Sequence, residues 1–447
     1  MATTSRSADL TSGPMLQKII LFSVPLAASS ILQLLFNAAD VVVVGRFAGS
    51  TALAAVGSNG ALINLLVNLF VGLSLGANVV AARCFGARDE KGVQDTVHTA
   101  VALGLVSGVL LAVVGFCAAR GLLELMSCPE DVIDLSALYL KIYFIGMPMT
   151  MLYNFSSALL RAVGDTKRPL YCLAAAGVIN VVLNLVFVIG FSMSVAGVAL
   201  ATIISQTVSA LLVTGMLVRE EGALRLDLRR LAFHAGTLKQ ILLIGLPAGL
   251  QSTVFSLSNV VIQSSINSFG SMVVAGNSAS SNLEGFVYTA MNAFAQAAVT
   301  FTSQNTGAGK PERVRAGIKS ATILGFVWSL VAFFLLYFGG AALVRMITDS
   351  DTFVIGTAVK YLRINVPFYA FLCILCFFRS TLQGLGQKII PVIASIIELS
   401  GKAIIVFVLV PRMGYLAVCI CEPILWILSG ILVSVPMYRF YLTKNVL

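Results

Sequence analysis

The chain has 447 residues, of which 58% are hydrophobic and 11% are charged, and its mean hydropathy is +0.96. These values lie far outside those of soluble domains and exclude a soluble globule. The formal net charge of +10 does not indicate a nucleic-acid-binding protein, because the basic residues are scattered over short loops with no basic face or stacking aromatic residues beside them.

Apolar stretches of about 20 or more residues recur along the whole chain, and each can cross a hydrocarbon core of ~30 Å as a helix. The polar segment 1–14 lacks the features of a cleaved signal peptide, so we expect the first helix to be retained. The sequence predicts an all-α integral membrane protein with about twelve transmembrane helices. The predicted spans are 16–44, 51–82, 95–119, 131–160, 169–191, 194–218, 238–268, 274–303, 316–347, 353–383, 390–410 and 413–440.

Lys and Arg are distributed unevenly over the predicted loops. Most of them follow the even-numbered spans, where Arg379 and Lys388 are counted with the loop after the tenth span. The loops after odd-numbered spans carry only Arg46, Arg120, Arg345 and Arg412. The positive-inside rule then predicts that the even loops and both termini are cytoplasmic, in the cytoplasmic (inner or plasma) membrane.

The two halves of the sequence resemble each other. LQKIILFSVP, ending at Pro25, recurs as LKQILLIGLP, ending at Pro247, and LLRAVGDTKRP recurs as TLQGLGQKIIP at the same spacing. Six predicted helices separate each pair, so the repeats have the same orientation and predict two six-helix, pseudo-symmetric lobes around a central cleft. The predicted segments are a cytoplasmic tail 1–15, an N-lobe 16–218, a linker 219–237, a C-lobe 238–440 and a C-terminal tail 441–447.

The first helix carries a polar stripe, because polar residues recur in it every three or four positions and therefore share one face. The stripe consists of Ser30, Gln33, Asn37 and Asp40. Pro25, upstream in the same helix, has no amide N–H for the helical hydrogen bonds and predicts a bend. Asp40 is a candidate functional residue because acids inside membranes are costly. Alternatively, it lies at the outer end of the span and reaches lipid headgroups.

Polar pairs at i, i+4 spacing occur in the fifth and sixth helices and could converge with Asp40. They are Asn180 with Asn184, and Thr202 with Gln206. A carboxylate among amide and hydroxyl oxygens can bind a cation such as Na+, and a desolvated carboxylate can carry a proton. Either ion would couple transport to a gradient.

In the second half, Asn259 takes the place of Asp40 in the seventh helix, without its charge. The eighth helix has a polar face that predicts either a cavity lining or interhelical hydrogen bonds; it consists of Asn277, Ser281, Glu284, Tyr288 and Asn292. Glu398 and Lys402, four residues apart in the eleventh helix, predict an ion pair. The candidates for a substrate cavity are Gln33, Asn37, Asn154, Gln251, Asn259, Glu284 and Tyr288.

The sequence predicts no enzyme. His98 and His234 lie in or near cytoplasmic segments, and no nucleophile with a base is visible. Because no GxxxxGK[ST] motif occurs, we expect no ATP hydrolysis by this chain. We expect no cofactor and no metal beyond Na+, and Cys373 and Cys376 have no His or carboxylate beside them.

Several segments together resemble the multidrug and toxic compound extrusion (MATE) family over essentially the whole chain. They are VPLAASSILQLLFNAADVVVVGRFAGSTALAAVG, the loop FGARDEKG with its repeat TGAGKPER, LLRAVGDTKRP, and NVVLNLVFVIGFSMSVAGVALAT. The resemblance implies two six-helix lobes whose cleft opens alternately to the two sides. It also implies a cation or proton site at Asp40, Asn180, Asn184 and Thr202, and a bending proline at Pro25.

One departure from the family pattern concerns Asn184 and Leu185, where many relatives have Asp followed by Pro. A second N-lobe carboxylate is therefore absent, which puts a two-carboxylate proton relay in doubt. The acids that another branch places in helices seven and ten are missing too. The chain more closely resembles the DNA-damage-inducible protein F-like branch, and this resemblance implies that Asp40 is the main coupling residue.

The resemblance implies a secondary antiporter that exports organic, often cationic, compounds in exchange for inward Na+ or H+. We expect a monomer whose partners are small organic substrates and membrane lipid. A flippase for lipid-linked saccharides remains an alternative, although only Lys141, Lys360 and Arg363 could bind its pyrophosphate. A transport-inactive receptor or scaffold is another, but it has no need of polar stripes in both halves.

Overall fold

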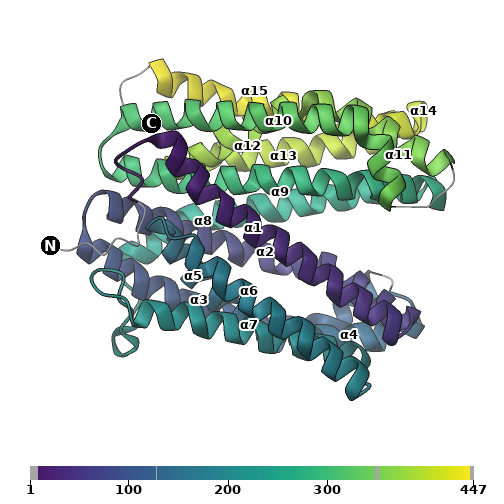
Figure 1. Cartoon of the computed structure of the whole chain (residues 1–447), viewed down its shortest axis with the longest axis horizontal. Coiled ribbons are helices and arrows are strands. Elements are labelled where there is room, and N and C mark those ends of the chain that lie inside the picture. The colour runs from purple at the N-terminus through teal and green to yellow at the C-terminus, as the bar shows by residue number, and fades with distance from the viewer. Residues whose placement is uncertain (1–8, 127, 348–351, 443–447) are drawn as a thin grey trace. The chain divides into compact units, whose positions relative to one another are not determined.

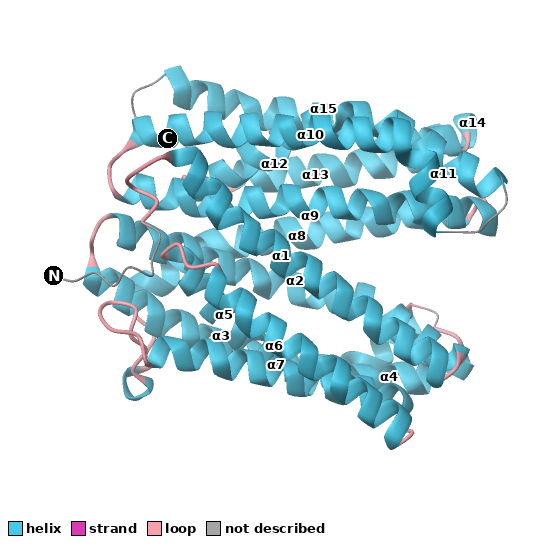
Figure 2. Cartoon of the chain, viewed as in Figure 1, coloured by secondary structure: helices cyan, strands magenta, loops and turns pink. Residues whose placement is uncertain are grey.

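The computed structural model describes residues 9–126, 128–347 and 352–442, and every regular element in these ranges is a helix (Figure 2). The predicted tails lie partly outside them. The helices are α1 (Met15–Phe47), α2 (Ser50–Gly86), α3 (Glu90–Leu125), α4 (Glu130–Ile145), α5 (Met147–Ala162), α6 (Lys167–Asn184), η1 (Leu185–Gly190), α7 (Ser194–Val218), η2 (Leu228–Arg230), α8 (Ala235–Asn267), α9 (Ser271–Gly307), α10 (Pro311–Ile347), α11 (Thr352–Asn365), η3 (Val366–Phe368), α12 (Tyr369–Gly384), α13 (Ile389–Ile404), η4 (Ile405–Leu409), α14 (Val410–Met413) and α15 (Tyr415–Leu442).

Within the described residues, ten helices are long and apolar enough to cross a membrane, and α4 with α5 makes an eleventh span with a 49° bend. The bend lies at Gly146, just before Pro148, whose missing N–H interrupts the helical hydrogen bonds. These spans agree with the predicted ones except the eighth. That span corresponds to α9, a continuous helix with too many polar residues to meet the same test.

The chain divides into two compact units, one formed by Val24–Gly249 and the other by Leu10–Ser23 with Leu250–Leu447. The divisions fall inside α1 and α8, close to the two prolines that mark the repeat, Pro25 and Pro247. Each of these helices therefore begins in one unit and ends in the other (Figure 1).

The first unit has an apolar core between α1, α2, α4, η1 and α7. Val44 of α1, Ala55 of α2 and Val198 of α7 are completely buried there, and Tyr139 of α4 packs with them. A second cluster is built around Phe144 and Met151. These contacts fix the end of α1 that carries Asp40.

The second unit has a comparable core where α8 meets η4 and α15, including Ile266, Ile405 and Val418. The short segment before α1 is fastened to this unit as well. Leu10 is 1% exposed, and its backbone carbonyl accepts hydrogen bonds from Asn305 and Arg313. Arg313 also donates to the carbonyls of the two residues before Pro14.

The repeat appears in the turns of the two units. Gly49 and Gly270, which precede α2 and α9, both have φ of 89°, a left-handed conformation that favours glycine. Both halves also contain a π-helical segment at the equivalent position, η1 after Asn184 and η4 after Ile404. Such segments are rare and occur often at functional sites.

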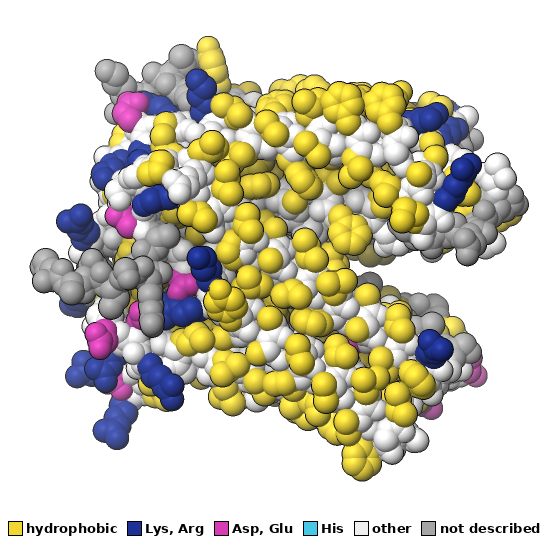
Figure 3. Space-filling model, in the orientation of Figure 1, with side chains coloured by type: hydrophobic (Ala, Val, Ile, Leu, Met, Phe, Trp, Pro, Cys, Tyr) yellow, Lys and Arg dark blue, Asp and Glu magenta, His cyan; other side chains and the backbone are white. Residues whose placement is uncertain are grey.

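Hydrophobic side chains cover the middle of the helices in each unit, and Lys, Arg, Asp and Glu gather at the helix ends (Figure 3). Among the exposed apolar residues are Val113 on α3, Val182 on α6 and Phe338 on α10. An apolar band between charged ends is the surface of a protein that lies in lipid.

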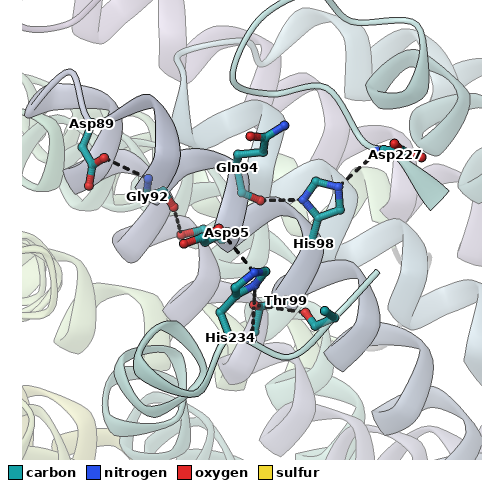
Figure 4. Close-up of polar contacts among 10 residues, drawn as sticks. Asp89, Gly92, Gln94, Asp95, His98, Thr99, Asp227 and His234 are labelled. Carbon is teal, nitrogen blue, oxygen red and sulfur yellow. Dashed lines mark hydrogen bonds and ion pairs between the residues drawn. The ribbon is translucent and has the colours of Figure 1, made fainter. Parts of the chain in front are cut away.

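The linker before α8 is docked on α3 in the first unit (Figure 4). His98 is 3% exposed; its Nδ1 donates to the Gln94 carbonyl at 2.8 Å and its Nε2 accepts from the Asp227 backbone N–H at 3.2 Å. Thr99 accepts from the His234 backbone N–H at 3.1 Å. Since both ring nitrogens of His98 have partners, the side chain has a structural role.

Replacing His98 with phenylalanine is expected to lower the free energy of unfolding by about 1–3 kcal/mol, because the backbone N–H of the half-buried Asp227 loses its acceptor. Thermal unfolding of the detergent-solubilised protein measures this loss. Arg120→Ala is the control, since Arg120 is exposed and its ion pairs with Glu124 and Asp134 contribute at most about 1 kcal/mol. Equal unfolding midpoints for both variants would contradict the docking role.

Candidate functional site

Asp40 on α1 lies against α6 in the first unit. It is half-buried, and its Oδ1 accepts a hydrogen bond of 2.5 Å from Nδ2 of Asn184. The same Nδ2 donates to Oδ1 of Asn180 at 3.2 Å. Asn180 and Asn184 are 5% and 0% exposed. Three of the four predicted cation-site residues therefore form one hydrogen-bonded group, and Asp40 is engaged within the protein.

The fourth predicted residue, Thr202 of α7, is not hydrogen-bonded to this group. Its hydroxyl donates to the Val198 carbonyl of its own helix at 2.9 Å. Thr202 is therefore not part of the hydrogen-bonded group, although a threonine hydroxyl that donates one hydrogen bond can still accept another.

The Asp40 group has the donor chemistry of a site for a hard monovalent cation or a proton. The carbonyl oxygen of Asn184 is buried and has no hydrogen-bond partner. One carboxylate with amide oxygens suits alkali cations better than transition metals, which prefer nitrogen and sulfur ligands. Within the described residues, no three His, Cys, Asp or Glu side chains are grouped to hold a metal ion.

The second unit contains a cavity of about 240 Å³ lined by side chains from α8, α9, α11, α12, α13 and α15. Three carboxylates face it, from Glu284, Glu398 and Glu422, together with the guanidinium group of Arg379. Aromatic rings form much of the remaining wall. Phe255 stacks on Tyr288 with 6.4 Å between ring centroids, and Tyr369 lies 5.9 Å from Trp426.

Comparison with known families gives a match on both halves of the chain. The MatE family model matches residues 25–186 and again residues 247–409. The chain belongs to the MatE family. The two matches begin at Pro25 and Pro247, which agrees with the internal repeat predicted from the sequence. The family consists of transporters, so its members are not enzymes.

Relatives and solved structures agree with this assignment. The chain is 30% identical to the probable multidrug resistance protein YoeA of Bacillus subtilis over 87% of its own length and 86% of the relative. It is 26% identical to the FAD transporter of Shewanella oneidensis over 73% and 72% of the two chains. The structure of a multidrug resistance MATE family transporter in an outward-facing conformation shares the fold, with 22% identity, a TM-score of 0.91 and coverage of 99% and 100%.

The predicted ion pair between Glu398 and Lys402 of this MatE protein is wrong. Lys402 pairs with Glu422 of α15 at 2.7 Å and donates to Asn259 of α8 at 2.7 Å. Glu398 lies 3.6 Å from Arg379 of α12 instead. The partners of Lys402 and of Glu398 thus come from neighbouring helices. A buried lysine needs more than one acceptor, and a single side chain on its own helix offers too few.

Arg379 is the main residue that sequence reasoning missed, because it was assigned to a loop. The structure places it inside α12 with 12% of its side chain exposed. Its position within the predicted span 353–383 was the available signal, since a basic residue inside a span is rarely free of a partner. Tyr361, Tyr369 and Trp426 were also missed, and periodicity could not distinguish them from packing aromatics.

The other predicted residues have varied positions. Asn259, Glu284 and Tyr288 line the cavity. Gln33 and Asn37 are exposed, Asn154 donates to the Thr150 carbonyl of its own helix, and Gln251 is buried and accepts from Gln383. Asn277 accepts from Tyr415. Pro25 lies in a continuous helix, α1.

Proposed function

We propose that the chain is a secondary active antiporter that exports organic, often cationic, compounds in exchange for inward Na+ or H+ by alternating access. Membership of the MatE family supports transport, and the probable multidrug resistance protein YoeA supports drug-like substrates. The FAD transporter among the relatives indicates that the family also handles larger polar compounds.

The observation that carries the proposal is the Asp40 group. Its carboxylate is held by the N–H₂ of a buried asparagine whose own carbonyl oxygen lacks a partner. A bound Na+ would gain the Asp40 carboxylate and the amide oxygens of Asn180 and Asn184, and a proton would neutralise Asp40 instead. Either event changes the charge at the junction of α1 and α6, which is the physical requirement for biasing two conformations.

The proposed energy source is the ion gradient. Each net positive charge that moves inward contributes about 2.3 kcal/mol per 100 mV of membrane potential. The proposed orientation places both termini in the cytoplasm, where Lys and Arg are most abundant. Lipid-linked saccharide flipping is less well supported, because neither Lys360 nor Arg363 lines the cavity of the second unit, and Lys141 belongs to the first unit, where it lies over the ring of Phe116.

Efflux of ethidium from proteoliposomes tests the proposal. A Na+ gradient and a pH gradient are imposed in turn, and ethidium fluorescence is followed with wild-type protein and with protein-free liposomes. We expect one gradient to accelerate efflux, and the gradient that does so identifies the coupling ion. An ethidium efflux rate that is the same with and without either gradient would contradict ion-coupled export.

A further inference from the structure

The cavity of the second unit contains an incompletely paired set of charges. Lys402 is saturated, because it pairs with Glu422, donates to Asn259 and lies 5.6 Å above the ring centroid of Phe255. It therefore has little capacity left for a ligand. The remaining charged groups are Glu284, Arg379 and Glu398.

Arg379 and Glu398 face each other without forming a close hydrogen bond. Their nearest atoms, Nη1 and Oε1, are 3.6 Å apart, and both Nη1 of Arg379 and Oε2 of Glu398 are buried without a hydrogen-bond partner. Buried charged groups with open positions are costly unless something else fills them. Both side chains line the cavity, so a ligand there can reach them.

Glu284 supplies the uncompensated charge. Its Oε1 accepts a hydrogen bond of 3.0 Å from the hydroxyl of Tyr369, and no ion pair joins it to a basic side chain among the residues that the structure describes. With Lys402 balancing Glu422 and Arg379 facing Glu398, the ionised set has one excess negative charge. One monovalent cation balances it.

We propose that this cavity binds a protonated amine that also carries a hydrogen-bond acceptor, with the ammonium group at Glu284 and the acceptor at Arg379. The amine balances the excess charge, and a carbonyl or amide oxygen fills the open Nη1 position. The rings of Phe255 and Tyr288 provide a flat apolar wall for an aromatic body. Arg379 is thus a specificity-determining residue that selects among organic cations.

The size of the cavity limits the ligand. At about 240 Å³ it is smaller than the ~300–1,000 Å³ of pockets for drug-sized compounds. A bicyclic amine is therefore a better probe than a larger dye. The role of this site in transport rests on the proposed function. Ligand binding to the purified chain, however, requires no ion gradient and can be measured by itself.

Three related indoles separate the two contributions in equilibrium binding to the full-length protein in detergent. Tryptophanamide has an amine and a carboxamide, tryptamine has the amine alone, and indole-3-propionamide has the carboxamide alone. We expect tryptophanamide to bind at least about tenfold more tightly than either of the others, the effect of one added hydrogen bond to a charged group. Equal affinities for tryptophanamide and tryptamine, or no binding of any probe, would overturn the proposal.

Two variants test the proposed roles of Arg379 and Glu284 separately. Arg379→Lys keeps the positive charge and loses the forked donor geometry, so the preference for tryptophanamide over tryptamine should fall to threefold or less. Glu284→Gln should weaken both amines by a similar factor of at least about tenfold and leave their ratio unchanged. An unchanged ratio in Arg379→Lys would remove Arg379 from the site. If Arg379→Lys does not fold, the proposal is still tested by the affinity ratio of tryptophanamide to tryptamine in wild type and by the equal loss of affinity for both amines in Glu284→Gln.

The outcomes remain separable from those of the efflux experiment. Selective binding without gradient-driven efflux contradicts the antiporter and leaves the binding site intact. Gradient-driven ethidium efflux without selective indole binding contradicts the binding site alone.

Discussion

Replacing Asp40 with asparagine is expected to reduce gradient-driven ethidium efflux to the rate of protein-free liposomes. Asparagine has nearly the same shape, but it can neither change its charge nor attract a cation with a full negative charge. The variant should remain folded, since Asp40 is half-buried and the asparagine oxygen can still accept from Asn184. Efflux assays and thermal unfolding of the same preparation measure the two quantities.

Asp134→Asn is a matched control for this experiment, because it makes the same chemical change at a side chain that is 78% exposed and forms a surface ion pair with Arg120. It should transport at the wild-type rate. Asn184→Leu should resemble Asp40→Asn, since it removes both the donor to Asp40 and the unpartnered carbonyl. Full gradient dependence in Asp40→Asn would remove Asp40 as the coupling residue.

Much of the fold follows from hydrophobic length and from the internal repeat. A segment of ~20 apolar residues folds as a helix in lipid, because its backbone N–H and C=O groups must form their hydrogen bonds within the segment. The break at Gly146 was not predicted, because the residues around it in the run 131–160 are apolar on both sides and only the position of Pro148 indicates it. Likewise, no composition rule marks the π-helical segments η1 and η4.

The two sites differ in how well the sequence predicts them. Asp40, Asn180 and Asn184 have regular helical spacing, so their faces could be matched, and the structure brings them together. The charges of the second unit are spread over α9, α12, α13 and α15, and their pairing depends on how these helices pack. Spacing within α13 suggested Glu398 with Lys402, whereas the neighbouring helices provide Arg379 and Glu422.

Replacing Lys402 with methionine is expected to destabilise the protein by about 3–5 kcal/mol, the usual cost of removing one partner of a buried ion pair. Lys402 is 1% exposed, and without it Glu422 and Asn259 lose their 2.7 Å contacts. Two of the three carboxylates at the cavity would then lack a compensating charge. Thermal unfolding in detergent at neutral pH measures the loss.

The double variant Lys402→Met with Glu422→Gln shows whether the loss comes from the ion pair with Glu422 or from the other contacts of the Lys402 ammonium group. Removing both members of a buried pair is often nearly neutral, because the desolvation cost disappears with the attraction. We therefore expect the second substitution to restore most of the lost stability, whereas Glu422→Gln alone leaves Lys402 unpaired and destabilises. If the double variant is as unstable as Lys402→Met, the lysine stabilises the second unit through the contacts of its ammonium group with Asn259 and the ring of Phe255, and the ion pair with Glu422 contributes little.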